Sequence, residues 1–456
     1  MSLFRTKAIQ LNLDEPNRVL HRCLNALDLT LMGIGAIIGA GVFVLTGVAA
    51  ATKAGPAISI SYIISGFACL CAALSYAELA ASVGGCGSAY SYSYATFGEI
   101  IAWIIGWDLL LEYTMSVSTV AIGWSGYVND VLKAMNINIP TALYKNPFEG
   151  GFINLPAVLI IVFLSVLLSL GVKESSRFNA LIVSIKLIAI AIFVGVASQN
   201  INLENWHPFA PFGWTGIMQG GAIVFFAYIG FDAVSTTAEE TINPQRNLPI
   251  GILASVVICT LIYILVSALL TVIVPYTTLN VSSPVADALL RLHYPIAAGL
   301  VAVGAIAGLT TVMLVMYYGL TRICLAISRD GLLPNFFSRI YPRTKTPVLI
   351  IVLSGIVIAA IAGFVPIGQA AELVNIGTLS AFTLVCGGVL VLRRTQPNLK
   401  RSFKVPFSPL IPLLGIFSCI YLMLNLPALT WWRFGIWLIV GLMVYFGYSK
   451  THSLQK

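Results

Sequence analysis

The chain has 456 residues, of which 58% are hydrophobic and 9% are charged, and its formal net charge is +8. A soluble domain carries roughly 25% charged residues because its surface faces water, so this composition excludes a soluble globule and indicates a protein surrounded by lipid. The basic residues are dispersed between apolar runs rather than gathered in one patch, which argues against nucleic acid as a partner.

Twelve apolar runs are long enough to form transmembrane helices, since about 20 such residues cross roughly 30 Å of hydrocarbon. The runs are 28–52, 57–83, 97–128, 152–171, 176–198, 215–240, 246–274, 284–327, 347–364, 370–391, 408–427 and 430–449. Two of them, 97–128 and 284–327, exceed the required length, so we expect these helices to be tilted or to extend beyond the bilayer. The sequence thus predicts an all-α polytopic membrane protein with twelve spans.

The distribution of positive charge predicts the orientation. With the N-terminus inside, 19 of the 25 basic residues fall in cytoplasmic segments and 5 in outer segments, while Lys186 lies within a span. By the positive-inside rule, both termini are expected to be cytoplasmic. No signal peptide is recognisable, so the first span is expected to direct insertion. The expected parts are a cytoplasmic segment 1–27, spans 1–5 in 28–198, spans 6–10 in 215–391, spans 11 and 12 in 408–449, and a cytoplasmic tail 450–456.

The first span contains four glycines within nine residues, from Gly33 to Gly41. A glycine inside a helix costs about 1 kcal/mol relative to alanine. A small-residue packing face of the GxxxG kind explains Gly35 and Gly39 but leaves Gly33 and Gly41 without a role. A break at Gly39-Ala40-Gly41 gives them one, because backbone N–H groups bared at midmembrane are tolerated where they face a cavity or a ligand.

The sixth span has Gly230 followed by Asp232 deep in an apolar run. We expect Ala227 to Gly230 to be unwound, and Asp232 to cap a second half-helix that begins near Ala233. The two breaks stand at the head of two blocks of five spans, and because five is odd, the second block enters the membrane from the opposite side. Paired interrupted spans in corresponding positions indicate an inverted-repeat transporter with a substrate site at the midplane.

At these residues the chain resembles the amino acid–polyamine–organocation transporter superfamily, and the similarity runs from about residue 20 to about residue 450. The matching segments are GIGAIIGAGVFVLTG (33–47), GPAISISY…ALSYAELA (55–80), GCGSAYSYSYATFG (85–98) and FFAYIGFDAVSTTAEETINPQR (225–246). The last segment and SRDGLLP (328–334) look most like the cationic amino acid transporter branch and its bacterial relatives. This resemblance implies the five-plus-five inverted-repeat fold of the leucine transporter type, with two extra C-terminal helices.

The resemblance also implies a zwitterionic amino acid held between the two breaks. Its carboxylate would meet backbone N–H groups near Gly39, Ala40 and Gly41, and its ammonium would meet the carbonyls of Ile38, Phe226, Ala227 and Ile229. The ends of two broken helices suit such a ligand, because one end offers donors and the other acceptors. Met316, which is bulky and apolar, lies in span 8, and that span flanks the pocket in the family. We therefore expect small neutral L-amino acids as substrates, with cationic ones as the alternative.

Lys186 lies about nine residues into span 5, which is roughly 13–14 Å deep at 1.5 Å per residue. Snorkelling to the interface would be a long reach for its side chain, and an intramembrane charge is by default a functional candidate. By the resemblance, an ammonium here takes the place of the cation of sodium-coupled members and bonds the carbonyls around the break in span 1. We infer that protons replace sodium as the coupling ion.

The remaining intramembrane acids are Glu78 in span 2, Asp108 and Glu112 in span 3, and Asp232 in span 6. Asp108 and Glu112 are four residues apart and therefore share one helix face. All four are candidate structural or pathway acids, and Asp108 and Glu112 either line a pathway or bond backbone groups within the bundle as neutral acids. All four histidines lie outside the spans or at their ends, so we expect no histidine proton relay, no metal site and no cofactor other than the coupled proton.

The pattern predicts a transporter and not an enzyme, since no HExxH, GxSxG or clustered His/Cys set occurs. The expected function is import of L-amino acids across the plasma membrane by proton symport, through alternating access around a site between spans 1 and 6. A cationic amino acid carrier or exchanger is the alternative, and a channel or a nutrient sensor on the same scaffold is a remoter one. The expected partners are the amino acid and membrane lipid, and the sequence specifies no protein partner.

Overall fold

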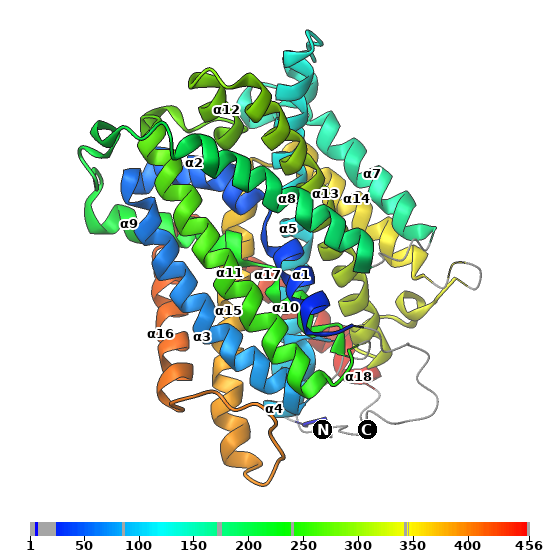
Figure 1. The fold of residues 1–456 in the computed structure, drawn as a ribbon. Helices are drawn as coiled ribbons and strands as arrows, with labels where there is room; N and C mark the ends of the chain where they lie inside the picture. The colour runs from blue at the N-terminus through cyan, green and yellow to red at the C-terminus, as the bar shows by residue number, and fades with distance from the viewer. Residues whose placement is uncertain are drawn as a thin grey trace.

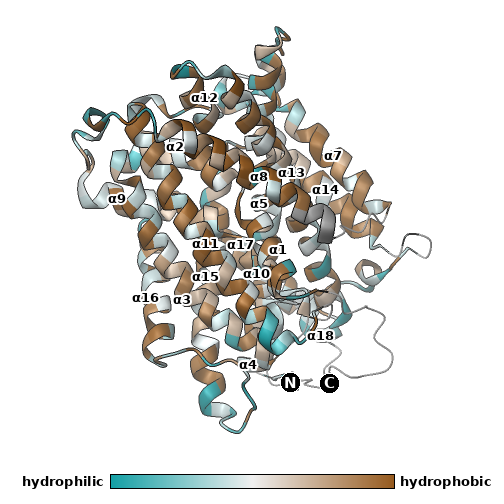
Figure 2. Cartoon of the chain, in the orientation of Figure 1, coloured by the Kyte–Doolittle hydropathy of each residue, from teal (hydrophilic) through white to brown (hydrophobic). Residues whose placement is uncertain are grey.

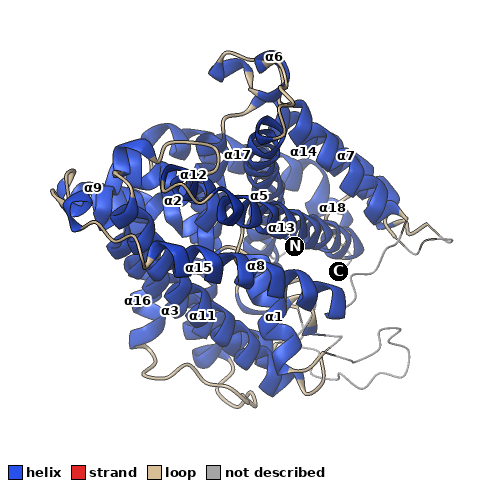
Figure 3. Cartoon of the chain, turned by 45° about the horizontal axis from the view of Figure 1, so that its top comes forward, coloured by secondary structure: helices blue, strands red, loops and turns tan. Residues whose placement is uncertain are grey.

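The computed structural model describes residues 5–7, 24–83, 87–170, 176–238, 241–341, 344 and 346–453, with the backbone alone at 176–180. Most of the expected cytoplasmic segment 1–27 and the last three residues of the expected tail therefore lie outside the described residues. Within the described residues the regular structure is helical, as Figure 3 shows. This agrees with the all-α prediction.

The first half of the chain contains α1 (Ala26–Ile37), the π-helix η1 (Gly41–Leu45), α2 (Thr46–Ala49), the π-helix η2 (Ala50–Ala54), α3 (Ile58–Ser82), α4 (Ala89–Thr96), α5 (Glu99–Ala134), α6 (Thr141–Tyr144), α7 (Leu155–Ser169) and α8 (Ser176–Ala197). The second half contains α9 (Gly213–Val224), the 3-10 helix η6 (Phe225–Tyr228), α10 (Phe231–Ser235), α11 (Pro244–Ile273), α12 (Pro284–Arg291), α13 (Pro295–Arg329), α14 (Val348–Phe364) and α15 (Ile367–Thr395). The chain ends in α16 (Leu410–Leu424), α17 (Ala428–Val444), the π-helix η10 (Tyr445–Ser449) and α18 (Lys450–His452). Short 3-10 turns join them at Gly55–Ala57, Pro147–Glu149, Leu203–Trp206, Tyr276–Thr278 and Asn335–Ser338.

Seven helical stretches among the described residues are long and apolar enough to cross a membrane, judged by length and composition. The first of these, Ala26–Ser82, turns back at Gly55, whose φ of +63° favours glycine (Figure 1). Four shorter apolar helices are α7, the Leu181–Ala197 part of α8, α14 and α16. Each of the twelve apolar runs in the sequence therefore contains a helix.

The helices of this bundle are apolar over most of their length, as the brown shading of Figure 2 shows. Large side chains such as Phe163 on α7, Ile356 on α14 and Met443 on α17 are 59%, 62% and 68% exposed. A soluble monomer rarely exposes contiguous apolar surface of this extent. These helices are therefore suited to contact with lipid.

The two long runs behave differently. Residues 99–128 of the first run belong to a single helix, α5, whose 36 residues would extend about 54 Å and so exceed the hydrocarbon thickness, as predicted. The prediction of one helix over 284–327 is wrong, because the chain turns between α12 and α13 at His293, where φ is +64°. The helix α12 contacts η1 and α8 as well as α13.

The interrupted helices α1 and α10 lie inside the bundle, where Figure 1 draws them among the longer helices. α1 contacts α8, α10, α11 and α13. The neighbouring long helix α3 contacts α9, α11, α15 and α16. The long helices thus surround the two interruptions and determine which side chains reach them.

Candidate functional site

The first interrupted helix is α1. It ends at Ile37, and Ile38 is extended, with φ −73° and ψ 101°. Helical backbone angles resume at Ala40, and η1 begins at Gly41. The predicted break is confirmed, but its centre is Ile38-Gly39, one residue earlier than expected.

The second interruption separates α9 from α10. The predicted unwound segment is confirmed in its second half only: Phe225–Tyr228 form a tight 3-10 turn, and the extended residue is Ile229, with ψ 137°. Gly230 follows with φ +119° and is the N-cap residue of α10. Since glycine alone readily adopts this angle, the new helix starts immediately after it, at Phe231.

The predicted N-cap position of Asp232 is wrong, although the acid does lie in the first turn of α10. Asp232 is the second residue of α10, and its carboxylate follows the N-cap position instead of occupying it. Its Oδ2 accepts a hydrogen bond of 2.6 Å from the Tyr113 hydroxyl on α5. The acid therefore links the second half-helix to α5.

The two interruptions are in backbone contact. A Cβ added to Gly41 would lie 2.3 Å from the Cα atom of Ala227, and a Cβ added to Gly230 would lie 2.8 Å from the carbonyl oxygen of Ala36. No larger residue fits either position without displacing backbone. The glycines at these two positions therefore allow span 1 and span 6 to touch where each is unwound.

Gly33 of α1 and Gly39 of the break have packing roles. A Cβ at Gly33 would lie 2.5 Å from the Ser255 hydroxyl on α11, and a Cβ at Gly39 would lie 3.1 Å from Val312 on α13. Close helix packing thus accounts for Gly33, which the sequence analysis left without a role in packing. The break and the small-residue face are both present in this one helix.

Lys186 on α8 is fully buried and reaches the break in α1. Its Nζ donates hydrogen bonds to the carbonyl oxygens of Gly35 (2.6 Å) and Ile38 (3.1 Å). Its stem packs against Gly308 of α13, where a Cβ would lie 3.0 Å from the Lys186 Cε. The bonds to carbonyls around the break in span 1 agree with the prediction, the stem adds a contact with span 8, and the snorkelling alternative is wrong.

Tyrosine hydroxyls satisfy further carbonyls at the breaks. The Tyr263 hydroxyl on α11 lies 2.9 Å from the carbonyl oxygen of Ile37 and 2.8 Å from that of Ala227, so it bridges the two interruptions. The Tyr127 hydroxyl on α5 donates to the carbonyl of Phe43 at 2.8 Å. The sequence analysis missed both residues, although a tyrosine inside an apolar helix usually needs a partner for its hydroxyl.

The carbonyls named as acceptors for an ammonium group are partly engaged. Ile38 accepts from Lys186, Ala227 from Tyr263, and Phe226 from the N–H of Ile229 at 3.2 Å. Each carbonyl oxygen has two lone pairs, so one further bond remains possible at each. On the other side of the break, the first turn of the resumed helix contains N–H groups without intrahelical acceptors.

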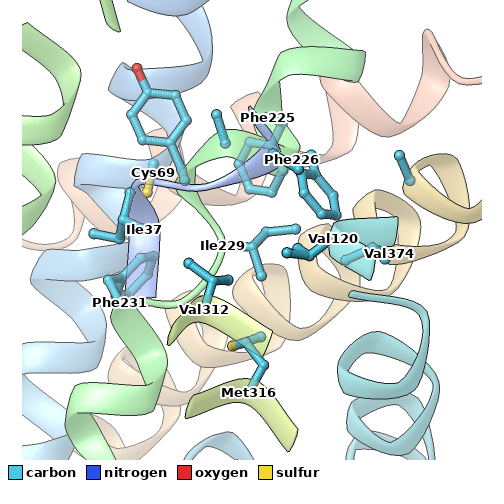
Figure 4. Packing of buried hydrophobic residues seen from close by; sticks show 14 of the residues in the cluster. Ile37, Cys69, Val120, Phe225, Phe226, Ile229, Phe231, Val312, Met316 and Val374 are labelled. Atoms are coloured by element: carbon cyan, nitrogen blue, oxygen red, sulfur yellow. The ribbon is translucent and has the colours of Figure 1, made fainter. Parts of the chain in front are cut away.

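The side chains around the interruptions are apolar. Figure 4 shows Ile229 and Phe226 from the second break near Val120 of α5, Met316 of α13 and Val374 of α15. All five are buried. Such surroundings suit an aliphatic group, although the buried acid Asp232 follows the second break by two residues.

The two acids of α5 are buried on the side that faces α15. A Cβ added to Gly377 would lie 2.6 Å from Oδ1 of Asp108. Within the described part of the chain, neither carboxylate oxygen of Asp108 has a hydrogen-bond partner, and Oε1 of Glu112 has none either. Buried polar groups are rarely left so, and both the pathway role and the neutral-acid role stay open for this pair.

Glu78 has a different environment. Its carboxylate accepts two hydrogen bonds from the guanidinium of Arg393, at 2.6 and 2.9 Å, and one from the backbone N–H of Val405 at 2.7 Å. Arg401 lies 3.4 Å from the same carboxylate. Glu78 is thus an ion-paired link between α3 and the chain at and beyond the end of α15, and not a neutral acid at the breaks.

Comparison with known proteins places this geometry in a family context. The sequence pattern of the family described as amino acid permease matches residues 24–447. The chain is 49% identical over 456 residues to the methylthioribose transporter of Bacillus subtilis (strain 168), which covers 99% of each chain. It is 48% identical over 459 residues to the branched-chain amino acid permease BcaP of the same organism, covering 99% of this chain and 98% of the other. It is 39% identical over 393 residues to the vacuolar cationic amino acid transporter 4 of Arabidopsis thaliana, covering 84% of this chain and 65% of the other.

Proposed function

Because the chain belongs to the amino acid permease family, a family of multi-pass membrane transporters, we propose that it imports L-amino acids across the plasma membrane by proton symport. The observation that carries the proposal is the backbone contact between two interrupted helices, Gly41 against Ala227 and Gly230 against Ala36. Interrupted helices expose unpaired backbone groups, which are stable at membrane depth where they face a ligand or a cavity.

In the proposed site the substrate carboxylate binds the N–H groups near Gly39, Ala40 and Gly41, and its ammonium binds the carbonyls of Ile38, Phe226, Ala227 and Ile229. The start of a helix attracts an anion and the end of one attracts a cation, so the two interruptions fit the two charges of a zwitterion. The binding step therefore needs no charged side chain at the ligand.

The proposed layout has twelve spans in two inverted blocks, 28–198 and 215–391, with 408–449 added outside them and both termini in the cytoplasm. The position of each interrupted helix at the head of its block supports the repeat. The low burial of Ala428–His452 supports an outer position for the last span. Of its 18-residue apolar stretch, 22% is buried, against 89% for that of Gly213–Ser235.

Two substrate classes deserve direct comparison. Apolar neighbours such as Val120, Met316 and Val374 favour an amino acid with an aliphatic side chain, and the relative named as a branched-chain amino acid permease supports this choice. The relative named as a methylthioribose transporter favours an uncharged thioether sugar instead. That ligand has no charges. Its hydroxyl groups would bond the same backbone atoms, and its methylthio group would lie beside Val120, Met316 and Val374.

Proton coupling is proposed to depend on Lys186. A lysine ammonium can release its proton, whereas a guanidinium cannot, and the bonds of Lys186 to Gly35 and Ile38 link its protonation to the shape of the first break. Alternating access would then follow protonation and substrate binding together. A channel on the same scaffold would lack saturation, so the kinetics of uptake separate these two functions.

The test is uptake by purified protein in liposomes, with an inward proton gradient and a panel of labelled leucine, valine, alanine, arginine and methylthioribose. Saturable uptake of the aliphatic amino acids, with weak competition by arginine, is the expected result. Saturable uptake of methylthioribose alone would establish the second candidate. Strong competition by arginine against labelled alanine would overturn the ranking of neutral over cationic substrates.

A further inference from the structure

A single asparagine on α15 bonds the end of α9. Asn375 is 1% exposed, and its Nδ2 donates to the carbonyl oxygens of Ala222 (2.7 Å) and Ile223 (3.1 Å). Both carbonyls belong to the last turn of α9, which ends at Val224 before the second interruption. The chain continues from α9 directly into η6, and the N–H of Phe225 also donates to the Ile223 carbonyl, so the amide adds donors where the α-helix changes into the 3-10 turn.

The same arrangement occurs in the first block. There the donor is Lys186 on α8, and the acceptors at the end of α1 are Gly35 and Ile38. Gly35 lies two residues before the last residue of α1, as Ala222 lies two residues before the last residue of α9. The acceptors Gly35 and Ala222 are 187 residues apart (222 minus 35), and the two donors are 189 apart (375 minus 186).

We propose that Asn375 is the counterpart of Lys186 in the second block: a positioning residue that holds the last turn of α9 on α15 and so fixes the second interruption. This proposal rests on the proposed function, because the ammonium of the substrate is assigned to carbonyls of that interruption. Asn375 lies in the fifth span of the second block, which is span 10. Its side chain carries no charge and does not touch the substrate.

The chemical difference between the two donors defines their roles. A lysine ammonium can lose its proton, whereas an asparagine amide keeps both N–H donors at any working pH. The contact made by Asn375 is therefore constant through the transport cycle, while the contact made by Lys186 changes with protonation. The proton-sensitive contact is confined to one block, and the other block contributes a fixed one.

The test compares variants of Asn375 in saturable uptake of the best substrate. Asn375→Ala removes the side-chain donor that the carbonyls of Ala222 and Ile223 share, so we expect KM to rise about tenfold, equivalent to about 1.4 kcal/mol, with proton-driven accumulation retained at saturating substrate. Asn375→Asp places oxygens against those two carbonyls, so its KM should rise further. Asn375→Gln keeps the donors and should restore most of the affinity.

The matched control is Ser380→Ala, since the Ser380 hydroxyl bonds only the carbonyl of Ile376 within α15, at 2.7 Å. We expect an unchanged KM for this variant. A second readout is hydrogen–deuterium exchange of residues 225–235 in nanodiscs without substrate, which should be faster in Asn375→Ala and unchanged in Ser380→Ala. If Asn375→Ala fails to fold, Asn375→Ser keeps one donor and should give intermediate KM and exchange.

The outcomes separate the two proposals. Unchanged KM and unchanged exchange in both Asn375→Ala and Asn375→Asp would overturn the role of Asn375. Loss of proton-driven accumulation in Asn375→Ala, as complete as in Lys186→Ala, would overturn the division of roles between the blocks. If the wild-type protein transports no member of the panel and Asn375→Ala still shows faster exchange, the positioning role is supported and the proposed function is overturned.

Discussion

Lys186 has three N–H donors and no acceptor, and two of its partners are backbone carbonyls next to the break in α1. In Lys186→Ala these carbonyls lose the charged donor, but the backbone groups assigned to the substrate remain. We expect substrate binding to persist with weaker affinity and proton-driven accumulation in liposomes to vanish. Lys186→Arg keeps its charge without releasing a proton, so accumulation should vanish there too.

The outcome that contradicts this prediction is a Lys186→Ala carrier that still concentrates substrate against its gradient when given protons. Binding is measured separately, by a substrate-induced shift of the melting temperature. A variant that neither binds nor accumulates would assign Lys186 to the integrity of the site instead of to coupling.

Gly41 supports a second residue-scale prediction. Because a Cβ at this position would lie 2.3 Å from the Cα atom of Ala227, Gly41→Ala must push the two interruptions apart. We expect uptake to be lost or reduced at least about tenfold, which corresponds to about 1.4 kcal/mol, while the protein still inserts into the membrane. The matched control is Gly435→Ala on α17, where no atom lies within 4 Å of the added Cβ. Normal uptake by Gly41→Ala would refute the close approach.

The environment of Asp232 changes what its variants should do. Its Oδ2 accepts from Tyr113, so Asp232→Asn keeps an acceptor for that hydroxyl and Asp232→Leu does not. We expect Asp232→Asn to bind substrate better than Asp232→Leu, as measured by the thermal shift on substrate addition. Equal loss of binding in both variants would indicate that the negative charge itself is required.

At the scale of the elements, Glu78 holds the start of the chain beyond α15 against α3. Its side chain is 1% exposed, whereas that of Arg393 is 27% exposed. Removing one partner of a fully buried ion pair typically costs about 3–5 kcal/mol of stability, so the cost here is smaller because Arg393 is partly exposed. We expect Glu78→Gln to lower the melting temperature in detergent by several degrees. The control is Asp287→Asn, which breaks the exposed pair with Arg291 on α12 and should have little effect. Equal melting temperatures for Glu78→Gln and the wild type would contradict this role.

The two interruptions were predictable because glycines are expensive inside helices and stand here in matching spans. The turn at His293 was not, since the apolar residues of 284–327 continue through it and only the positive φ marks the change. The first residue of α10 was misplaced for a related reason: Asp232 is a preferred capping residue, but Gly230 turns the chain two residues earlier.

The candidate site was predictable in its backbone and only partly in its side chains. Lys186 was identifiable because a charge within a span has few structural explanations. Tyr263 and Asn375 were not, because a lone tyrosine or asparagine in an apolar helix can be satisfied in many ways. Tyr263 bonds the carbonyl of Ile37, 226 residues away along the chain, and Asn375 bonds that of Ala222, 153 residues away. A single sequence does not contain such a relation.

At the scale of the whole molecule, the ion that drives transport can be tested directly. If Lys186 fills the cation position between spans 5, 1 and 8, no sodium ion is needed to complete the site. We expect uptake in liposomes to follow an imposed inward proton gradient and to be unchanged when sodium is replaced at constant pH. Abolition of uptake on removal of sodium would contradict this prediction.

The contact of Gly41 with Ala227 also has a mechanical consequence. Two backbones that touch leave no side chain between them that could give way. Gly41 begins η1, after the first break, and Ala227 lies in η6, before the second. A displacement of either segment toward the other is therefore passed on directly from backbone to backbone.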